Sequence, residues 1–413
     1  MRAWSAAGVA GAAVVMLSGC PSSAPVRPAD PAGSQLSWVV AAVSRAPLDR
    51  RELERHFTGR FLVEVPPERL NRTLRSMAGL TVSKVARLSP AALVATARAG
   101  SRRLEVRLTL DAAGRIAGLL FRPPARPVPA NWAEVDARVR GAFLAAEITP
   151  SGCRITHGVA AAVVRPMGSM FKLYVLGAVA RAVRQGTLSW DTPLTVDARL
   201  KSLPSGVLQE RRDGSAVSVL EAARLMISIS DNTATDLLIH RVGRRAVEQI
   251  VRAWDGQAGG NTPLLTTREL FVLKGAAYPR YAAGYLRAAD KRRFLDSVVA
   301  GVPLASVKSW GRPRETGRLE WFGSPLDLCR AHAELRALTD PRIAEIMSAH
   351  DGELGLGWPS VWFKGGTEPG VLARSYSVLR PDGTIGFAVA MTADQRATGE
   401  LVALAKAGLT LKR

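Results

Sequence analysis

The stretch RPMGSMFKLYVLG, residues 165–177, places Ser169 three positions before Lys172 at the start of an apolar run. If this run is helical, the two side chains share a face, and the lysine amine can approach the serine hydroxyl. A lysine whose pKa is lowered by burial or by a second cation can act as the base for a nucleophilic serine. The same spacing also fits a serine that caps a helix whose first turn holds the lysine. The stretch alone leaves both interpretations open.

A second candidate motif lies in SISDNTATDLL, residues 228–238, between two apolar helical segments. Read as local structure, Ser230, Asp231 and Asn232 form an ordinary helix cap. Read as chemistry, Ser230 would relay a proton to a leaving group, Asn232 would bind a substrate amide, and Asp231 would brace the loop.

A third motif lies in WFKGGTEPG, residues 362–370, on an apolar strand near the end of the chain. Lys364 supplies a charge for a substrate carboxylate, and the two following glycines let a substrate backbone approach closely. Thr367 adds an amide and a hydroxyl. The structural alternative is a strand that runs into a Gly-Gly turn.

Together and in this order, the three motifs resemble the S-x-x-K, S-D-N and K-T-G set of class A β-lactamases and penicillin-binding proteins. Ser230 follows Ser169 by about 60 positions, close to that family's spacing. The resemblance covers residues 131–413 and implies that Ser169 is a nucleophile rather than a cap. It implies that the catalytic groups are Ser169, Lys172, Ser230 and Lys364. The groups that bind the substrate or its oxyanion would be Asn232, Gly366 and Thr367, with the backbone amides of Ser169 and Thr367 as the oxyanion hole. Asp231 would have a structural role.

The chain departs from this family at two places. Class A enzymes carry a deacylating glutamate in an E-x-x-L-N loop roughly 36 positions after the S-D-N serine, an offset that lands on Thr266. No E-x-x-L-N is present, and nearby Glu269 is expected to form a capping box with Thr266. Gly365 also stands where the family has a hydroxyl-bearing residue. Acylation can therefore proceed, whereas deacylation of a β-lactam should be slow.

The first 20 residues, MRAWSAAGVAGAAVVMLSGC, have the three-part form of a secretory signal and are too short for a comfortable membrane span. The letters LSGC at residues 17–20 resemble the lipobox of bacterial lipoproteins, which implies cleavage after residue 19 and a lipid on Cys20. A plain signal peptide is the alternative. Residues 20–35 are a Pro/Ser/Ala-rich tether. The expected protein is exported and anchored to the membrane.

Two domains are expected from the length of 413 residues and from the pattern that follows the tether. Residues 36–122 show two helical segments, 36–46 and 48–57, and then period-two strands, which indicates a small α+β domain that resembles the ketosteroid-isomerase and nuclear-transport-factor folds in outline. Residues 123–130 are a proline-rich linker. Residues 131–413 should form a β-lactamase-like α/β sandwich, with a helix at 132–143, strands at 144–148 and 158–164, three late strands, and a last helix at 395–409.

Composition excludes several function classes. The formal charge of +21 is spread as scattered arginines with no basic run among aromatics, which argues against nucleic-acid binding and allows contact with anionic cell-wall polymers. The histidines and cysteines lack ligand spacing, so neither a metal nor another cofactor is expected. Cys153 and Cys329 can form at most one disulfide, and their spacing does not show that they pair.

In both departures and in its small first domain, the chain resembles a narrower group of proteins, the β-lactamase-fold hydrolases of clavulanic-acid gene clusters and their lipoprotein relatives. This resemblance implies a serine hydrolase that acts through an acyl-enzyme at Ser169 on β-lactam-like amides or small esters. Two alternatives stay open. One is a working class A β-lactamase in which Glu269 or another carboxylate is the base, and the other is a non-catalytic binding lipoprotein at the cell surface.

Overall fold

The computed structural model describes residues 30–412. The expected signal segment, Cys20 and most of the tether lie outside these residues. The chain forms two compact units that divide between Pro124 and Ala125. Within the described range, no helix is both long and apolar enough to cross a membrane.

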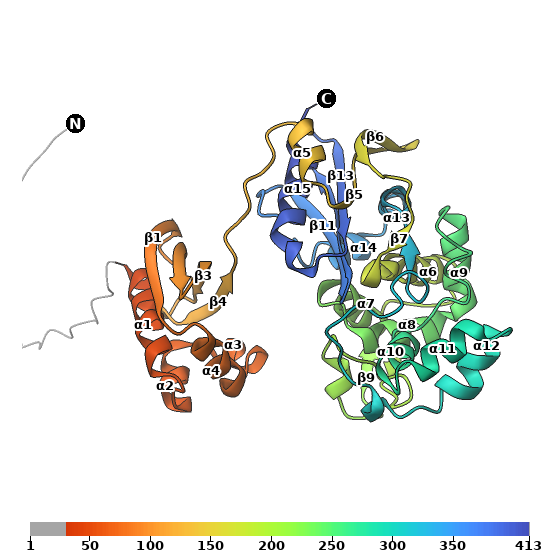
Figure 1. The fold of residues 1–413 in the computed structure, drawn as a ribbon, viewed down its shortest axis with the longest axis horizontal. Helices are drawn as coiled ribbons and strands as arrows, with labels where there is room; N and C mark the ends of the chain where they lie inside the picture. Colours follow the sequence, from red (N-terminus) through yellow and green to blue (C-terminus); the bar gives the residue numbers. More distant parts are fainter. Residues whose placement is uncertain (1–29, 413) are drawn as a thin grey trace, which may run out of the picture. The chain divides into compact units, whose positions relative to one another are not determined.

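The first unit packs four helices against one face of a four-stranded antiparallel sheet in the order β1-β2-β3-β4 (Figure 1). Alternation along β2 explains the packing, because Leu93, Ala95, Ala97 and Ala99 are buried while the residues between them are not. The predicted α+β fold class is confirmed. The bounds are α1 Pro31–Arg45, α2 Arg50–His56, α3 Gly59–Glu64, α4 Pro67–Ser76, β1 Leu80–Ser89, β2 Ala92–Ala99, β3 Arg102–Leu110 and β4 Ile116–Arg122.

Helices α3 and α4 were missed by the sequence analysis, because both are short and prolines separate them. Thr58 caps α3 by accepting a hydrogen bond from Phe61 N, and Pro67 begins α4. A tertiary contact holds α4 in place. Buried Asn71 accepts from Leu48 N at 2.8 Å and donates to Leu48 O at 2.9 Å.

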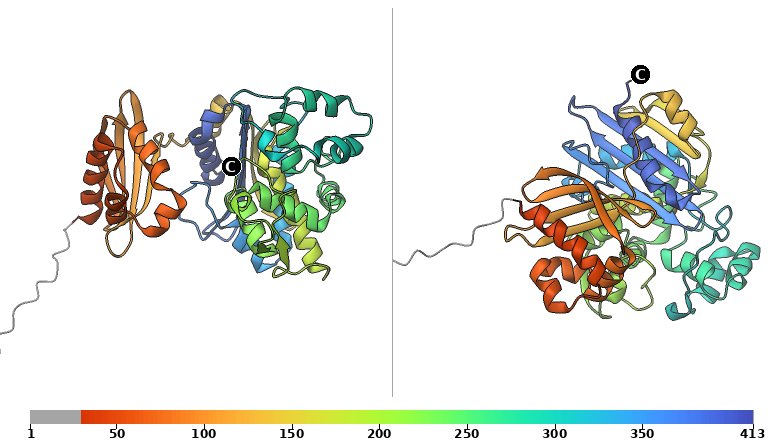
Figure 2. Two further views of the ribbon diagram at one scale, coloured as in Figure 1. Left: turned by 90° about the horizontal axis from the view of Figure 1, so that it is seen from below. Right: turned by 60° about the vertical axis from the view of Figure 1, so that its left-hand side comes forward.

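The second unit is built on a five-stranded antiparallel sheet in the order β11-β12-β13-β5-β6. Helices α5 and α15 cover one face, where Val135 and Leu401 pack on Phe143, and the remaining helices cover the other face (Figure 2, left). The predicted β-lactamase-like sandwich is confirmed. The sheet and its covering helices are β5 Gly141–Thr149, β6 Gly152–Val159, β11 Ser360–Glu368, β12 Val371–Leu379, β13 Ile385–Thr392, α5 Trp132–Arg138 and α15 Thr398–Thr410.

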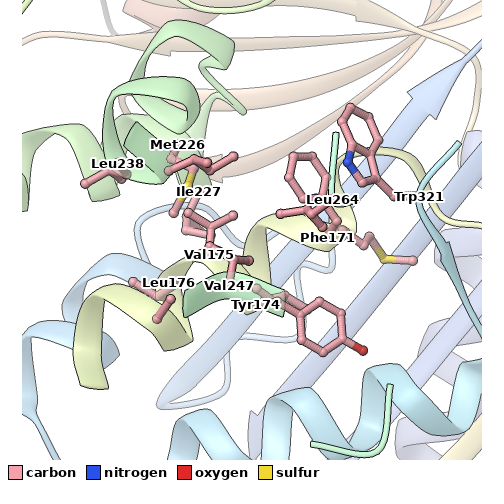
Figure 3. Close-up of a cluster of buried hydrophobic side chains, with 14 of the residues drawn as sticks. Phe171, Tyr174, Val175, Leu176, Met226, Ile227, Leu238, Val247, Leu264 and Trp321 are labelled. Atoms are coloured by element: carbon pink, nitrogen blue, oxygen red, sulfur yellow. The ribbon is translucent and has the colours of Figure 1, made fainter. Parts of the chain in front are cut away.

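The helical layer surrounds α6, whose apolar side chains meet those of the neighbouring helices in one core (Figure 3). Its helices are α6 Lys172–Arg184, α7 Val219–Ser228, α8 Asn232–Val242, α9 Arg244–Ala253, α10 Thr267–Gly275, α11 Arg280–Arg287, α12 Lys291–Phe294, α13 Pro325–Ala337 and α14 Pro341–Met347. Single turns are η1 Gly168–Phe171, η2 Leu208–Glu210, η3 Leu295–Val299, η4 Leu304–Ser306 and η5 Gln395–Ala397. Two short pairs complete the unit: β7 Arg165–Pro166 with β10 Phe322–Gly323, and β8 Pro193–Thr195 with β9 Ala216–Ser218.

Two predicted boundaries in this unit were wrong. The helix expected over 132–143 ends at Arg138, and β5 begins at Gly141, where a Cβ would meet Met391 O of the neighbouring strand at 2.0 Å. The strand expected over 158–164 ends at Val159, because Ala160 takes the left-handed conformation with φ 49°. Both boundaries depend on sheet pairing, which apolar periodicity does not show.

Candidate active site

The candidate nucleophile Ser169 lies in η1, directly before α6. Ser169 is half-buried, whereas its neighbours Met170 and Phe171 are completely buried. The Phe171 ring stacks on Trp321 with centroids 3.9 Å apart, and Met167 N donates to Trp321 O (Figure 3). This packing fixes the turn that presents the serine.

The candidate base Lys172 is fully buried at the start of α6. Its Nζ lies 2.6 Å from Ser230 O, 3.1 Å from Ser230 Oγ and 2.7 Å from Asn232 Oδ1. Burial, and then the charge of Lys364, hold the pKa of Lys172 well below its usual range. The lowered pKa favours the neutral amine, which is the form that can accept a proton. Among the described residues, the Ser169 hydroxyl has no hydrogen-bond partner, so the lysine is directed toward the S-D-N loop in this state.

The Ser230 hydroxyl lies between two lysines. Ser230 has φ 59° in the turn between α7 and α8, and this left-handed geometry aims its side chain at Lys172 and Lys364. Lys364 Nζ, from β11, is 3.0 Å from Ser230 Oγ and 2.8 Å from Gly365 O. Burial, and then the nearby Arg374, lower the pKa of Lys364 to about 7. Ser230 can therefore pass a proton between two amines of lowered basicity.

Asp231 braces the loop that precedes this motif. Its buried carboxylate accepts hydrogen bonds from Val207 N at 2.7 Å, Leu208 N at 3.0 Å and Ala234 N at 2.8 Å. Gly206 makes room for the carboxylate, since a Cβ there would lie 2.3 Å from it. The carboxylate thus starts α8 and holds the loop together.

Asn232 is anchored at both ends of its side-chain amide. Its Nδ2 donates to Leu203 O at 2.8 Å, and its Oδ1 accepts from Lys172. The expected contact of Asn232 with a substrate amide stays a prediction.

The β11 backbone runs against the Ser169 turn, and only glycine fits there. A Cβ on Gly366 would lie 2.2 Å from Met167 O and 2.8 Å from Ser169 N, and one on Gly168 would lie 3.2 Å from Thr367 N. The amides of Ser169 and Thr367 therefore meet in one region. Paired amides of this kind can stabilise an oxyanion.

Glu269 forms the expected capping box with Thr266 at the start of α10, and this prediction is confirmed. Its carboxylate also makes a bidentate pair with Arg244, at 2.8 and 2.6 Å. The cavity that Glu269 lines, of about 500 Å³, also holds Asp236 and His240 but none of the four catalytic candidates. Glu269 therefore has a structural role at the start of α10.

Several buried polar groups near the site were missed, because nothing in their spacing marks them. His332 Nε2 lies 3.0 Å from Ser375 Oγ, which donates to Lys364 O and so ties α13 to β11. Burial lowers the pKa of His332 to about 3, so the imidazole is neutral. Within residues 30–412, no group of three histidine, cysteine or acidic side chains is arranged to hold a metal.

Cys153 of β6 and Cys329 of α13 form a disulfide, with Cα atoms 6.3 Å apart. It joins the outer strand of the sheet to the helix that carries His332. The pairing that sequence spacing left open is therefore decided by the fold.

The sandwich, the nucleophile turn and the lysine-flanked serine define the second unit as a domain of the class A β-lactamase and penicillin-binding-protein superfamily. Residues 154–301 match the model of the β-lactamase enzyme family. Residues 27–116 match a second family model, described as the N-terminal part of the ORF 12 gene product. No curated protein is a significant match to the chain.

Solved structures similar to the chain include PBP-A, at 20% identity over 69% of this chain and 96% of that one, with a TM-score of 0.46. A β-lactamase from Sphaerobacter thermophilus is 21% identical over 67% of this chain and 96% of its own, with a TM-score of 0.48. A β-lactamase from Chitinophaga pinensis is 18% identical over 67% and 94%, with a TM-score of 0.44.

Proposed function

We propose that this protein is an exported, lipid-anchored serine hydrolase that forms an acyl-enzyme at Ser169 with β-lactam-like amides or small esters and releases β-lactam products slowly. The observation that carries the proposal is the Ser230 hydroxyl held between Lys172 and Lys364, with Lys172 three residues after Ser169 in the chain. A protein that only binds its ligand does not need the two buried amines of Lys172 and Lys364 around the Ser230 hydroxyl in addition to Ser169.

In the acylation step, Ser169 Oγ bonds to the substrate carbonyl carbon while its proton passes to the neutral amine of Lys172. The carbonyl electron pair moves to the oxygen, which the amides of Ser169 and Thr367 stabilise. When the intermediate collapses, the bond to the leaving nitrogen or oxygen breaks. That atom takes the proton of the Ser230 hydroxyl, and Lys172 restores it. Lys364 in its charged form would bind a substrate carboxylate.

Deacylation needs a base that activates water, and the arrangement of Glu269 supports a slow step. The Glu269 carboxylate is bound to both terminal nitrogens of Arg244 and to the Thr266 amide, and its cavity contains none of the four catalytic candidates, so it is not placed to activate water at Ser169. An ester substrate forms the same acyl-enzyme from a better leaving group, so small esters suit this site.

Export and anchoring rest on residues 1–20, with Cys20 as the lipidated residue. The excess of basic residues supports contact with anionic wall polymers. Cys20→Ser should move the protein from the membrane fraction to the soluble fraction, whereas Cys329→Ala, which replaces a disulfide-bonded cysteine instead, should leave it in the membrane.

Intact-protein mass spectrometry tests the chemistry. The purified protein is incubated with benzylpenicillin and with a 3'-acetoxy cephalosporin, and adduct and product are followed over time, with Ser169→Ala as the control. A long-lived adduct that Ser169→Ala abolishes supports the proposal. Rapid ring opening without an accumulating adduct would favour a working β-lactamase, and neither adduct nor turnover would favour the binding lipoprotein.

A further inference from the structure

The helices of the first unit pack on only one face of its four-stranded sheet. On β2, Leu93, Ala95 and Ala97 point to the helices and are buried, and the residues between them point to the opposite face. We call this opposite face the open face. Its charged residues, which are exposed or half-buried, are Lys84, Arg98, Arg103, Glu105, Arg107 and Arg122. All but Glu105 are basic, so the open face carries a strong positive charge.

Two arginines lie directly opposite each other on the open face. Arg98 of β2 and Arg103 of β3 are cross-strand partners, and both are exposed. Like charges in this arrangement destabilise a sheet. Within residues 30–412, neither guanidinium has a hydrogen bond or an ion pair, and the same is true of the amine of Lys84 in the neighbouring row. A repulsive pair that the chain leaves uncompensated indicates an anionic partner outside the chain.

The one acidic residue of the open face is shared by two arginines. Glu105 Oε1 lies 2.7 Å from Arg107 Nε and 2.6 Å from Arg122 Nη2. A single carboxylate balances only one of these two positive charges. The positive potential of the open face therefore extends from β1 to β4.

A row of apolar side chains crosses the open face beside the charged ones. Ala86, Val94, Arg107 and Leu120 are successive cross-strand partners, so they form one row over all four strands. Leu120 is 44% exposed. Exposed apolar side chains among basic ones favour the boundary between lipid headgroups and acyl chains. A soluble polyanion binds through its charges and gains nothing from Leu120.

The tether begins beside this row. Asp30, the N-cap of α1, forms an ion pair with Arg87, the residue that follows Ala86 on the edge strand β1. Cys20 precedes Asp30 by about ten positions, and ten residues reach at most about 36 Å. A lipid on Cys20 would therefore keep the open face within reach of the membrane surface.

We propose that the open face docks on an anionic membrane surface. Lys84, Arg98 and Arg103 contact the phosphates of the lipids, and Val94 and Leu120 lie at the level of the headgroups. The inference rests on the proposed function, because the lipid on Cys20 holds the first unit beside the membrane. It gives the first unit a task separate from the chemistry at Ser169.

The soluble Cys20→Ser protein tests the open face without the anchor. It is mixed with phosphatidylcholine vesicles that contain or lack phosphatidylglycerol, and the bound fraction is measured by co-sedimentation. We expect binding to the anionic vesicles alone, and we expect about 1 M salt to abolish it, because the Debye length is then about 3 Å. A salt wash should therefore still release Cys20→Ser protein from the membrane fraction.

A matched pair of double variants separates the open face from the overall charge. Arg98→Gln with Arg103→Gln should lower the vesicle partition coefficient about tenfold to thirtyfold. Arg51→Gln with Arg55→Gln removes two exposed arginines of α2, which packs on the other face of the sheet through Leu53. This control removes the same charge and should lower the partition coefficient by less than about twofold.

Leu120→Ser tests the apolar row. It should lower vesicle binding about threefold to tenfold and leave binding of soluble polyphosphate unchanged. Thermal unfolding checks that each variant is folded. The Tm of Arg98→Gln with Arg103→Gln should be no lower than that of wild type, because the variant loses a repulsive pair.

Equal losses in the two double variants would mean that only net charge attracts the protein, and the inference would be wrong. Binding of soluble polyphosphate that depends on Arg98 and Arg103, without binding to anionic vesicles, would assign the open face to a wall polymer and would also overturn it. The mass of wild-type protein from membranes reports the lipid on Cys20 independently. If that lipid is absent, the proposed anchoring fails, whereas the vesicle assay still decides whether the open face binds lipid.

Discussion

Lys172 and Lys364 direct their amines at the same oxygen, Ser230 Oγ, at 3.1 and 3.0 Å. Burial lowers the pKa values of both lysines, and a nearby positive charge adds to the effect, that of Lys364 at Lys172 and that of Arg374 at Lys364. One amine is therefore available as a base near neutral pH while the other can still carry charge. This division matches the two tasks proposed for them, proton transfer and carboxylate binding.

Lys172→Met keeps the length and burial of the side chain and removes the amine. We expect the rate of adduct formation at Ser169 to fall by about 10² to 10⁴, the usual contribution of a positioned base. Lys291→Met, a partly buried lysine of α12, should have no effect. Time-resolved mass spectrometry measures both, and acylation of Lys172→Met at the wild-type rate would exclude the lysine as the base.

The pH dependence of catalysis should report Lys364. Because its pKa is about 7, its charge is lost as the pH rises through neutrality, and kcat/KM for a carboxylate-bearing β-lactam should then decline. An uncharged ester such as p-nitrophenyl acetate should not show this decline. If kcat/KM declines over the same pH range for both substrates, the decline is due to the titration of a group other than Lys364.

The lowered pKa of Lys364 also predicts the direction in which the free energy of unfolding changes with pH. In the unfolded chain Lys364 returns to its ordinary pKa of 10.5, so the unfolded state binds more protons between pH 7 and pH 10.5. The contribution of Lys364 to the free energy of unfolding should therefore rise with pH over this window. Denaturant melts at several pH values measure the slope, and Lys364→Met should make it shallower. An unchanged slope would contradict a lowered pKa.

The two glycines after Lys364 should respond in opposite ways. Gly366→Ala places a Cβ 2.2 Å from Met167 O, so we expect at least about a hundredfold loss of acylation, comparable to removal of an oxyanion donor. In Gly365→Ser the closest group to the new Cβ is the edge of the Phe363 ring at 3.0 Å, with Ala373 O at 3.5 Å, and the hydroxyl should strengthen binding of carboxylate substrates about fivefold. Acylation rates measure the effect of Gly366→Ala, and inhibition constants measure the effect of Gly365→Ser. A fully active Gly366→Ala variant would contradict the close approach of Gly366 to Met167 O.

Asp231→Ala should destabilise the second unit by about 3 to 5 kcal/mol, because two buried amides and one partly buried amide lose a charged acceptor. Asp191→Ala, at an exposed turn, should change stability by less than about 0.5 kcal/mol. Urea unfolding followed by tryptophan fluorescence compares them. Equal stabilities would mean that the loop before α8 is held by other contacts.

Removal of the disulfide by the double change Cys153→Ala and Cys329→Ala should cost about 2 to 5 kcal/mol, since it closes a long loop between β6 and α13. Reductant should lower the Tm of wild-type protein toward that of the variant and have no effect on the variant itself. Free thiols at both positions in protein purified without reductant would argue against the pairing.

Local patterns in the sequence were enough for much of this structure. Period-two alternation located the four strands of the first unit, and the three motifs identified the superfamily of the second. The capping box of Thr266 and Glu269 was also readable, because its partners are three positions apart and interact within one helical turn. Such features can be predicted because their residues are close in the sequence, so that the local backbone geometry alone brings them together.

Contacts between distant residues were decided only by the tertiary structure. Lys172 and Lys364 meet at Ser230 because α6, β11 and the α7–α8 turn pack around one point, and Cys153 finds Cys329 across 176 residues. The cluster of Lys274, Glu320 and Glu368 has no signature in spacing, since its members come from segments that only the fold makes neighbours. Burial then sets the chemistry of Lys172, Lys364 and Glu368, because these side chains would keep ordinary pKa values in water.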